Sequence, residues 1–278
     1  MSENAFEAAG IVAEQNVAIT MRDGVTLRAN LFRPAKSGAL PALLLRIPYN
    51  KDAAQTYVYA HPAWYARHGY AVLVQDSRGR YASEGEFYPL RQDGEDGFDT
   101  IEWCAAQPWC DGKLGMMGIS WGGFNGLQIA ALQPPALKAV VSLASTDDRY
   151  ADDVHYMGGA MVIDQLSWSA HMFAINTLPP DPALVGERWS EMWRERLEDQ
   201  SLWLETWAAH QRRDAYWKHG SVCEDYGVWK EKQMYGKTYF GIERTTVLIA
   251  ADGTIARIWP RVKVPGHAEE VLEAVKAL

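Results

Sequence analysis

The sequence predicts an α/β fold whose central sheet is mostly parallel. Three apolar runs, Leu40–Ile47, Tyr70–Gln75 and Leu137–Ala144, are typical of buried strands, and segments with a helical pattern separate them. Strands that alternate with helices along a chain form a parallel sheet with helices on both faces. A further apolar strand ends near Gly118 and leads into the segment that indicates the chemistry.

Shorter elements surround these strands. Two β-rich runs, Asn16–Met21 and Val25–Phe32, are separated by Arg22-Asp23-Gly24, a combination typical of a hairpin. Helices are expected around Pro62–His68 and over Asp93–Ala106. Ligands of parallel sheets bind beyond the carboxyl ends of the strands, so residues that follow the strands are the candidates for a site.

The pattern Gly-x-Ser-x-Gly at 118–122 stands between an apolar strand and a helix. The nucleophile elbow of a serine hydrolase has this layout, because the tight turn requires small residues two positions before and after the serine. Ser120 is therefore the candidate nucleophile, and the backbone N–H of Trp121 is a candidate donor to an oxyanion. The alternative is a structural glycine-rich turn. Residues 107–113 are expected to form the turn that precedes the strand.

Composition excludes several classes of protein. The chain has 27 basic and 35 acidic residues, a net charge of −8 and no basic block, which argues against nucleic-acid binding. No apolar run approaches the ~20 residues of a membrane-spanning helix.

The three cysteines have no metal-type spacing, and no metal or cofactor is expected. An odd cysteine count without a basic, apolar leader predicts a cytoplasmic protein. No pattern indicates an oligomeric state.

The pattern changes after residue 147. The segment 148–227 is rich in tryptophan, has no convincing strand, and is expected to form several helices, including 184–198 and 201–212. Because it directly follows a sheet strand, we interpret it as a cap over the site, and a plain helical subdomain is the alternative.

The last part of the chain has a different pattern again. Two β-rich runs, Thr245–Ala250 and Thr254–Trp259, flank the turn Asp252-Gly253, and a helix is expected over His267–Ala277. This predicts a ββα unit at the C-terminus. We therefore expect three parts, at residues 1–147, 148–227 and 228–278.

Six motifs in the first 227 residues form a specific set: Met21–Leu27, Arg46–Tyr49, Gln75–Arg80, Ser83–Gly85, Gly118–Gly123 and Arg213–Trp217. This set resembles the cocaine esterase and Xaa-Pro dipeptidyl-peptidase family of α/β-hydrolases. The resemblance implies an α/β-hydrolase sheet with a helical cap and a small-molecule ester or amide substrate, including acyl esters and Xaa-Pro peptides. It implies Ser120 as nucleophile, with the Tyr49 hydroxyl and the Trp121 N–H as oxyanion donors.

The resemblance stops after Arg213–Trp217. The family's later strand with the triad aspartate, its triad histidine and its jelly-roll domain have no counterpart here, so a truncated sheet is expected. His267 and Asp252 remain as weak candidates for base and acid, although the hairpin turn already explains Asp252. Asp76 and Arg78 are interpreted as a structural pair that holds the loop after a strand.

The segment 228–278 contains Met234–Lys237, Gly241–Thr246 and Trp259–Ala268. These runs resemble the C-terminal end of a bacterioferritin-comigratory-type peroxiredoxin, which implies the end of a thioredoxin-like fold. The family's peroxidatic Thr-x-x-Cys segment is missing, and Cys104, Cys110 and Cys223 do not match it. Arg244 would then be a surface charge, and the chain is interpreted as a fusion near Gly227.

Four functional hypotheses follow. The first is a serine hydrolase acting through Ser120, weak or inactive because the base and its carboxylate are missing. The second is an intact hydrolase that uses His267 as base. The third is a non-catalytic fragment or pseudo-enzyme. A peroxiredoxin ranks last.

Overall fold

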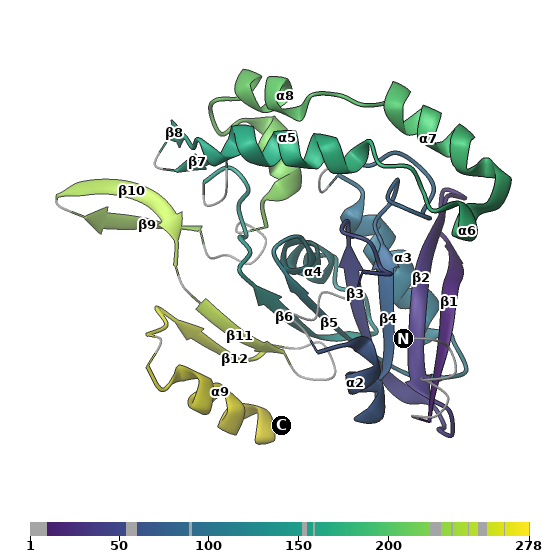
Figure 1. Ribbon diagram of the computed structural model, residues 1–278. Coiled ribbons are helices and arrows are strands. Elements are labelled where there is room, and N and C mark those ends of the chain that lie inside the picture. The colour runs from purple at the N-terminus through teal and green to yellow at the C-terminus, as the bar shows by residue number, and fades with distance from the viewer. Residues whose placement is uncertain are drawn as a thin grey trace.

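The computed structural model describes most of the chain. The described residues are 10–53, 60–88, 91–151, 155–157, 159–222, 229–234, 236–243, 245–249, 255–263 and 265–277. They form a sheet with flanking helices, a helical layer across one end of the sheet's strands, and a C-terminal part of two hairpins and a helix (Figure 1). No described helix is long and apolar enough to cross a bilayer.

The central sheet has six strands in the order β1-β2-β4-β3-β5-β6. The four strands β4, β3, β5 and β6 run parallel, whereas β1 and β2 are antiparallel to their neighbours. The strands are β1 (Ile11–Thr20), β2 (Thr26–Pro34), β3 (Leu40–Ile47), β4 (Ala71–Asp76), β5 (Cys110–Ile119) and β6 (Leu137–Leu143). The expectation of a mostly parallel α/β sheet is confirmed.

The helices α2, α3 and α4 cover this sheet, and the residues in the first turns of α2 and α3 favour helix formation there. The helix α2 (Pro62–Arg67) begins with proline at a first-turn position, where its missing N–H costs nothing. The helix α3 (Asp93–Ala105) carries three acidic residues in its first turn, which favour the positive end of the helix dipole. The helix α4 (Trp121–Ala131) follows Ser120 directly.

The central strands of the sheet are buried on both faces. Every residue of β4 is buried, as expected for a central strand of an α/β sheet. One core cluster joins the sheet to α3 and α4, and the other joins it to α2. Residues 110–113 belong to β5 rather than to the turn that the sequence predicted, because Cys110 already pairs with Leu40 of β3 and the register shifts before the next pair, Leu114 with Ala42.

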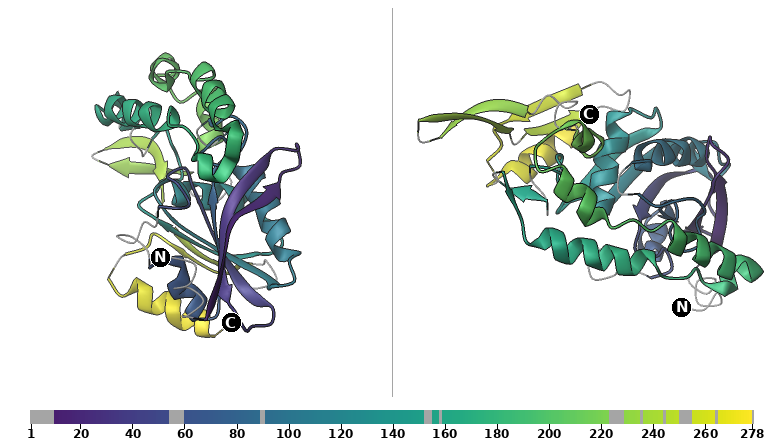
Figure 2. Two further views of the ribbon diagram at one scale, coloured as in Figure 1. Left: turned by 45° about the vertical axis from the view of Figure 1, so that its right-hand side comes forward. Right: turned by 90° about the horizontal axis from the view of Figure 1, so that it is seen from above.

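The segment after β6 forms the cap that the sequence predicted as helical. Its helices are α5 (Asp164–Asn176), α6 (Pro182–Val185), α7 (Trp189–Glu198) and α8 (Trp203–Ala209), with 3-10 turns at Gly186–Arg188 and Ala215–Gly220. Two short strands, β7 (Tyr156–Met157) and β8 (Ala160–Met161), were not expected. In Figure 1 and in the left view of Figure 2, the cap helices lie along one end of the sheet.

Tryptophans form the core between cap and sheet. Trp203, Trp207 and Trp217 of the cap are buried in one cluster with Trp121 at the start of α4. Trp168 of α5 stacks on Trp121 with ring centroids 6.0 Å apart and planes 10° apart. The tryptophan-rich composition of 148–227 is therefore explained by aromatic packing onto the first turn of α4.

The C-terminal part contains two hairpins and a terminal helix. The second hairpin, β11 (Thr245–Ile249) with β12 (Ile255–Pro260), and the helix α9 (His267–Lys276) are the ββα unit that the sequence predicted. The first hairpin, β9 (Trp229–Met234) with β10 (Lys237–Ile242), was missed. The strand β9 is rich in lysine and polar residues, and in β10 the aromatic residues Tyr239 and Phe240 are adjacent in the sequence, so neither strand has the apolar alternation that identifies a strand.

Candidate active site

The elbow forms where the sequence predicted it. Ser120 lies between the last residue of β5 and the first of α4, with φ +52° and ψ −116°. A left-handed φ is uncommon for a residue other than glycine, and strain of this kind persists where the surrounding structure imposes it. A Cβ at Gly118 would overlap the backbone of Gly122, and one at Gly123 would press on the Ser145 and Ser142 hydroxyls. Gly118 is therefore required by the tight turn from β5 into α4, and Gly123 by the close approach of α4 to Ser142 of β6 and to Ser145.

The two candidate oxyanion donors lie, like Ser120, beyond the carboxyl ends of the sheet's strands. Strands β3 and β5 are parallel neighbours. Tyr49, two residues beyond β3, and Ser120, one residue beyond β5, therefore follow adjacent carboxyl ends. Tyr49 is half-buried and packs on the aromatic cluster that contains Trp121. The topology thus brings Ser120, Tyr49 and Trp121 to one region.

A buried ionic network holds the first turn of α4, and sequence reasoning missed it. The fully buried indole of Trp121 donates from Nε1 to Asp93 Oδ2 at 3.0 Å. Asp93 is paired with Arg46, whose Nη1 lies 3.4 Å from Asp93 Oδ1 and also donates to the Asp93 carbonyl. One turn further along α4, the Asn125 amide donates to the Arg46 carbonyl at 3.0 Å. Arginine inside an apolar strand was the available signal, because such a charge requires partners.

Asp76 and Arg78 have structural partners, but they do not form the pair with each other that the sequence suggested. Asp76 is fully buried and accepts the backbone N–H of Lys51 at 2.7 Å. Arg78 instead pairs with Asp96 at 2.6 Å and with Asp23 at 2.8 Å. Two side chains at positions i and i+2 lie on the same face only within a β-strand. Because β4 ends at Asp76, the Arg78 side chain is not held on the same face as Asp76.

A base for Ser120 would have to be one of the seven histidines of the chain, all of which lie in its described parts. Within the described parts of the chain, the Ser120 hydroxyl makes no hydrogen bond to a histidine. His155 is the buried histidine of the aromatic cap, where it lies against Trp207 with ring centroids 4.3 Å apart. Burial and the nearby Arg149 lower its pKa to about 2, which disfavours the imidazolium that a general base must become.

The weak candidates for base and acid lie in the tail. His267 begins α9, and its Nε2 lies 2.8 Å from Thr246 Oγ1 of β11. Its Nδ1 lies 4.0 Å from Glu270 Oε2. Figure 1 and the left view of Figure 2 show α9 at the opposite end of the molecule from the cap. Asp252 lies outside the described residues, as do Arg244 and Cys223.

The described cysteines offer no reactive sulfur. Cys104 and Cys110 are buried and free, and burial raises the pKa of both thiols, so neither has the thiolate character of a reactive cysteine. In the part of the chain that the structure describes, no group of three or more histidine, cysteine or acidic residues could hold a metal ion.

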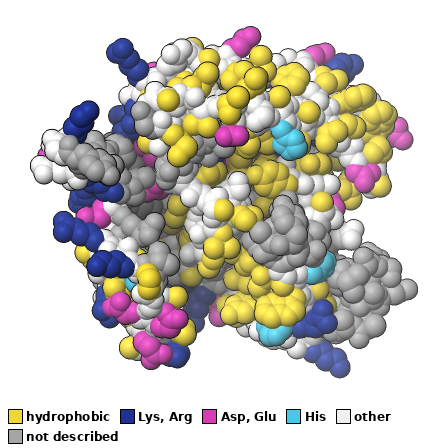
Figure 3. All heavy atoms as spheres, turned by 60° about the vertical axis from the view of Figure 1, so that its left-hand side comes forward, with side chains coloured by type: hydrophobic (Ala, Val, Ile, Leu, Met, Phe, Trp, Pro, Cys, Tyr) yellow, Lys and Arg dark blue, Asp and Glu magenta, His cyan; other side chains and the backbone are white. Residues whose placement is uncertain are grey.

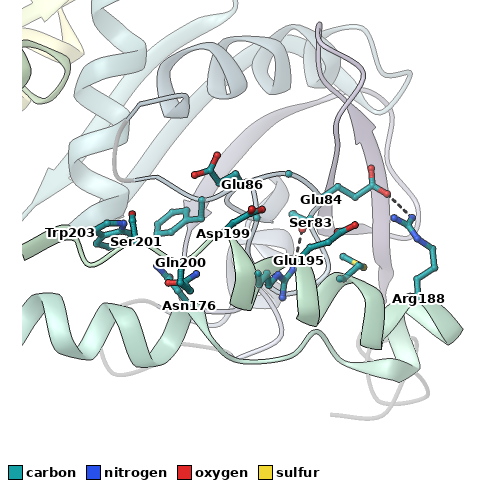
Figure 4. A pocket seen from close by; sticks show the side chains of 15 residues that line it. Ser83, Glu84, Glu86, Asn176, Arg188, Glu195, Asp199, Gln200, Ser201 and Trp203 are labelled. Carbon is teal, nitrogen blue, oxygen red and sulfur yellow. Dashed lines mark hydrogen bonds and ion pairs between the residues drawn. The ribbon is translucent and has the colours of Figure 1, made fainter. Parts of the chain in front are cut away.

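A cavity of about 210 Å³ lies between the cap and the loop that follows β4 (Figure 4). Its lining comes from Gly79 and residues 83–87, from Asn176 of α5 and from several residues between 188 and 203 around α7. Arg188 closes one end through an ion pair with Glu84 at 3.0 Å. Ser120, Tyr49 and Trp121 are not among the lining residues, so this cavity is distinct from the elbow.

Comparison with known proteins identifies relatives for most of the chain. The family model "X-Pro dipeptidyl-peptidase (S15 family)" matches residues 23–248, more than half of the chain. Cocaine esterase from Rhodococcus sp. (strain MB1 Bresler) is 41% identical over 158 residues, which are 56% of this chain and 28% of the esterase. A CocE/NonD family hydrolase from Staphylococcus aureus has a similar structure, with TM-score 0.64, 25% identity, and coverage of 77% of this chain and 39% of that chain.

A second set of relatives matches a separate short stretch. Peroxiredoxin Bcp from Xanthomonas campestris is 49% identical over 57 residues, which are 20% of this chain and 36% of that protein. The resemblance of the sequence to two families is therefore confirmed. The chain spans well under half the length of each of these relatives. The match to the S15 family model reaches residue 248 and so extends beyond Gly227 into the predicted tail.

Proposed function

The chain belongs to the X-Pro dipeptidyl-peptidase (S15) family, and we propose on that basis that it is a serine hydrolase of ester or amide bonds with Ser120 as its nucleophile. The observation that carries the proposal is the strained Ser120 at the β5–α4 turn, at the edge of the sheet that also bears Tyr49. The substrate is a small acyl ester or an Xaa-Pro peptide.

The roles of the three residues follow from acyl-transfer chemistry. Ser120 Oγ attacks the carbonyl carbon of the substrate while its hydroxyl proton passes to water, and the carbonyl oxygen becomes negatively charged. When the C=O bond re-forms, the bond to the leaving alcohol or amine breaks, and water later hydrolyses the acyl-serine. The Trp121 N–H, at the positive end of α4, and the Tyr49 hydroxyl donate hydrogen bonds to that oxygen. The buried Asp93–Arg46 pair holds the Trp121 indole and thereby the first turn of α4.

We propose weak turnover for the chain, because Ser120 has no histidine partner among the described residues. Without its base a serine hydrolase retains roughly 10³-fold acceleration over water, which comes from the oxyanion donors and substrate binding. We further propose three parts, with a hydrolase core at 1–147, a cap at 148–227 and a peroxiredoxin-like tail at 228–278.

The test is hydrolysis of a short chromogenic acyl ester by the full chain and by Ser120→Ala and Tyr49→Phe. We expect Ser120→Ala to remove the part of the protein-dependent rate that passes through attack by Ser120, while the part due to the oxyanion donors and substrate binding remains. Tyr49→Phe should lower the rate by about 10²-fold, as for removal of one oxyanion donor. Asp164→Asn, on the exposed start of α5, is the control. An unchanged rate in Ser120→Ala would favour a non-catalytic protein.

A further inference from the structure

We propose that Arg80 is a positioning residue that couples the cap to Tyr49. The inference rests on the proposed function, because Tyr49 matters only if it donates to an oxyanion. Arg80 belongs to the motif Gln75–Arg80, for which the proposed chemistry has no use. Its guanidinium joins the loop that carries Tyr49 to the last turn of the cap helix α5.

On the side of the sheet, Arg80 holds the residue next to Tyr49. Its Nε donates to the Pro48 carbonyl at 3.1 Å. The same loop is held two residues beyond Tyr49, where the Lys51 N–H donates to Asp76 Oδ1 at 2.7 Å. Tyr49 is therefore flanked by two attachment points, both supplied by the Gln75–Arg80 motif.

On the side of the cap, Arg80 holds the end of α5. Its Nη1 donates to Asn176 Oδ1 at 2.7 Å, and both terminal nitrogens lie 3.2 Å from the Ile175 carbonyl. The carboxyl end of a helix carries partial negative charge, which favours a cation there. Asn176 is 3% exposed, so its side chain has little freedom to follow a displaced guanidinium.

The burial of Arg80 makes this link rigid. The residue is 2% exposed, and the faces of Tyr81 and Phe87 lie 5.0 and 5.3 Å from its guanidinium carbon. A buried charge is costly unless its hydrogen bonds are made, so a shift of α5 that broke them would be opposed. The planar guanidinium can satisfy Pro48 and Asn176 together, which a lysine ammonium on a single stem cannot reproduce. A displacement of the cap therefore moves the Tyr49 loop.

The experiment compares two buried arginines in the full chain. Arg80→Lys removes the bridge, whereas the matched control Arg196→Lys alters a cap arginine that binds the Tyr81 and Ser83 carbonyls without contacting Pro48. We expect faster amide hydrogen exchange over residues 47–53 in Arg80→Lys, and an unchanged rate in that segment for Arg196→Lys. This measurement requires no catalytic activity. Equal exchange in the two variants would overturn the proposal.

The second arm asks whether Arg80 acts through Tyr49. Arg80→Lys should lower kcat for the acyl ester about 10-fold with little change in KM, because a misaligned donor weakens only the transition state. In a Tyr49→Phe background the same change should have no effect, and an additive loss would overturn the proposal. If Arg80→Lys fails to fold, Asn176→Ala replaces it, because that variant removes one partner of Arg80 and keeps the buried charge. It should lower kcat about 3-fold, and it should have no effect in the Tyr49→Phe background.

The two proposals fail separately. An unaltered rate in Ser120→Ala contradicts the proposed hydrolase, and the exchange over residues 47–53 then still decides whether Arg80 holds the loop. A Ser120-dependent rate with an additive Arg80–Tyr49 pair contradicts only the positioning role.

Discussion

At the scale of single residues, buried polar groups at the carboxyl edge of the sheet determine how the site is held. Asp76 and Arg80 bind the backbone within two residues of Tyr49, and Asp93 binds the side chain of Trp121, the residue after Ser120. Their hydrogen bonds go to the neighbours of Ser120 and Tyr49, so their contribution is to geometry. Their chemistry also makes the stability of the fold depend on pH.

Asp76 is expected to destabilise the fold as the pH rises. Burial raises its pKa from 3.8 to about 7, although Lys51 opposes the shift. The native state therefore holds a proton that the unfolded chain has released, and the free energy of unfolding falls between about pH 4 and pH 7. Asp76→Asn should be more stable relative to the parent at pH 8 than at pH 5, by up to a few kcal/mol. Urea unfolding at both pH values measures this difference.

The control for Asp76 is Asp99→Asn. Asp99 is partly buried, but its pair with Arg22 outweighs that burial and lowers its pKa. A lowered pKa gives stability that is already complete above pH 5, so the difference between Asp99→Asn and the parent should be equal at pH 5 and pH 8. If the free energy of unfolding changed with pH in the same way for Asp76→Asn and the parent, the raised pKa of Asp76 would be contradicted.

His267 is expected to contribute little to hydrolysis. Its ring is engaged by Thr246 and faces Glu270, both within the C-terminal part. His267→Ala should therefore leave the rate of ester hydrolysis within a few-fold, whereas Ser120→Ala should change it more. A loss of several orders of magnitude in His267→Ala would restore a complete triad and reverse the interpretation.

At the scale of elements, β6 is the exposed edge of the six-stranded sheet. Val141 and Leu143 of this strand are 52% and 46% exposed. Further apolar side chains are exposed on β7, β8 and α5, and hydrophobic atoms gather over one face of the molecule (Figure 3). An apolar edge strand offers unpaired backbone groups to another chain.

This edge predicts self-association that a charge can suppress. Val141→Lys should raise the protein concentration at which light scattering begins, because lysine on an edge strand disfavours pairing with another strand. Leu166→Lys is the matched control, since Leu166 is equally exposed, at 58%, but lies on helix α5. An equal effect of the two substitutions would assign the association to general hydrophobicity rather than to the edge.

At the scale of the whole molecule, the chain joins a well-packed core to small sheets. Two-stranded sheets such as β9–β10 and β11–β12 are marginally stable on their own. The cap, in contrast, is attached through its tryptophan cluster and through Arg80 and Arg196. The connection between cap and tail should therefore open most easily.

Limited proteolysis tests this prediction. Dilute protease should cut first within residues 213–240, and mass spectrometry of the early products should recover a core with its cap. The structural reason is that local opening is easiest where few apolar contacts are buried. Uniform resistance along the chain would indicate one integrated fold instead of a hydrolase part joined to a tail.

The sequence by itself determined the α/β class, the elbow at Ser120 and the ββα end, because strand periodicity, glycine in tight turns and hairpin residues are local signals. It missed β9 and β10, whose polar residues lack apolar alternation, and it paired Asp76 with Arg78. Only the tertiary structure decided the partners of Arg46, Arg80 and Asp93. Each contacts residues remote in sequence, since a buried charge is stabilised by whichever polar groups the packed fold brings within hydrogen-bond distance.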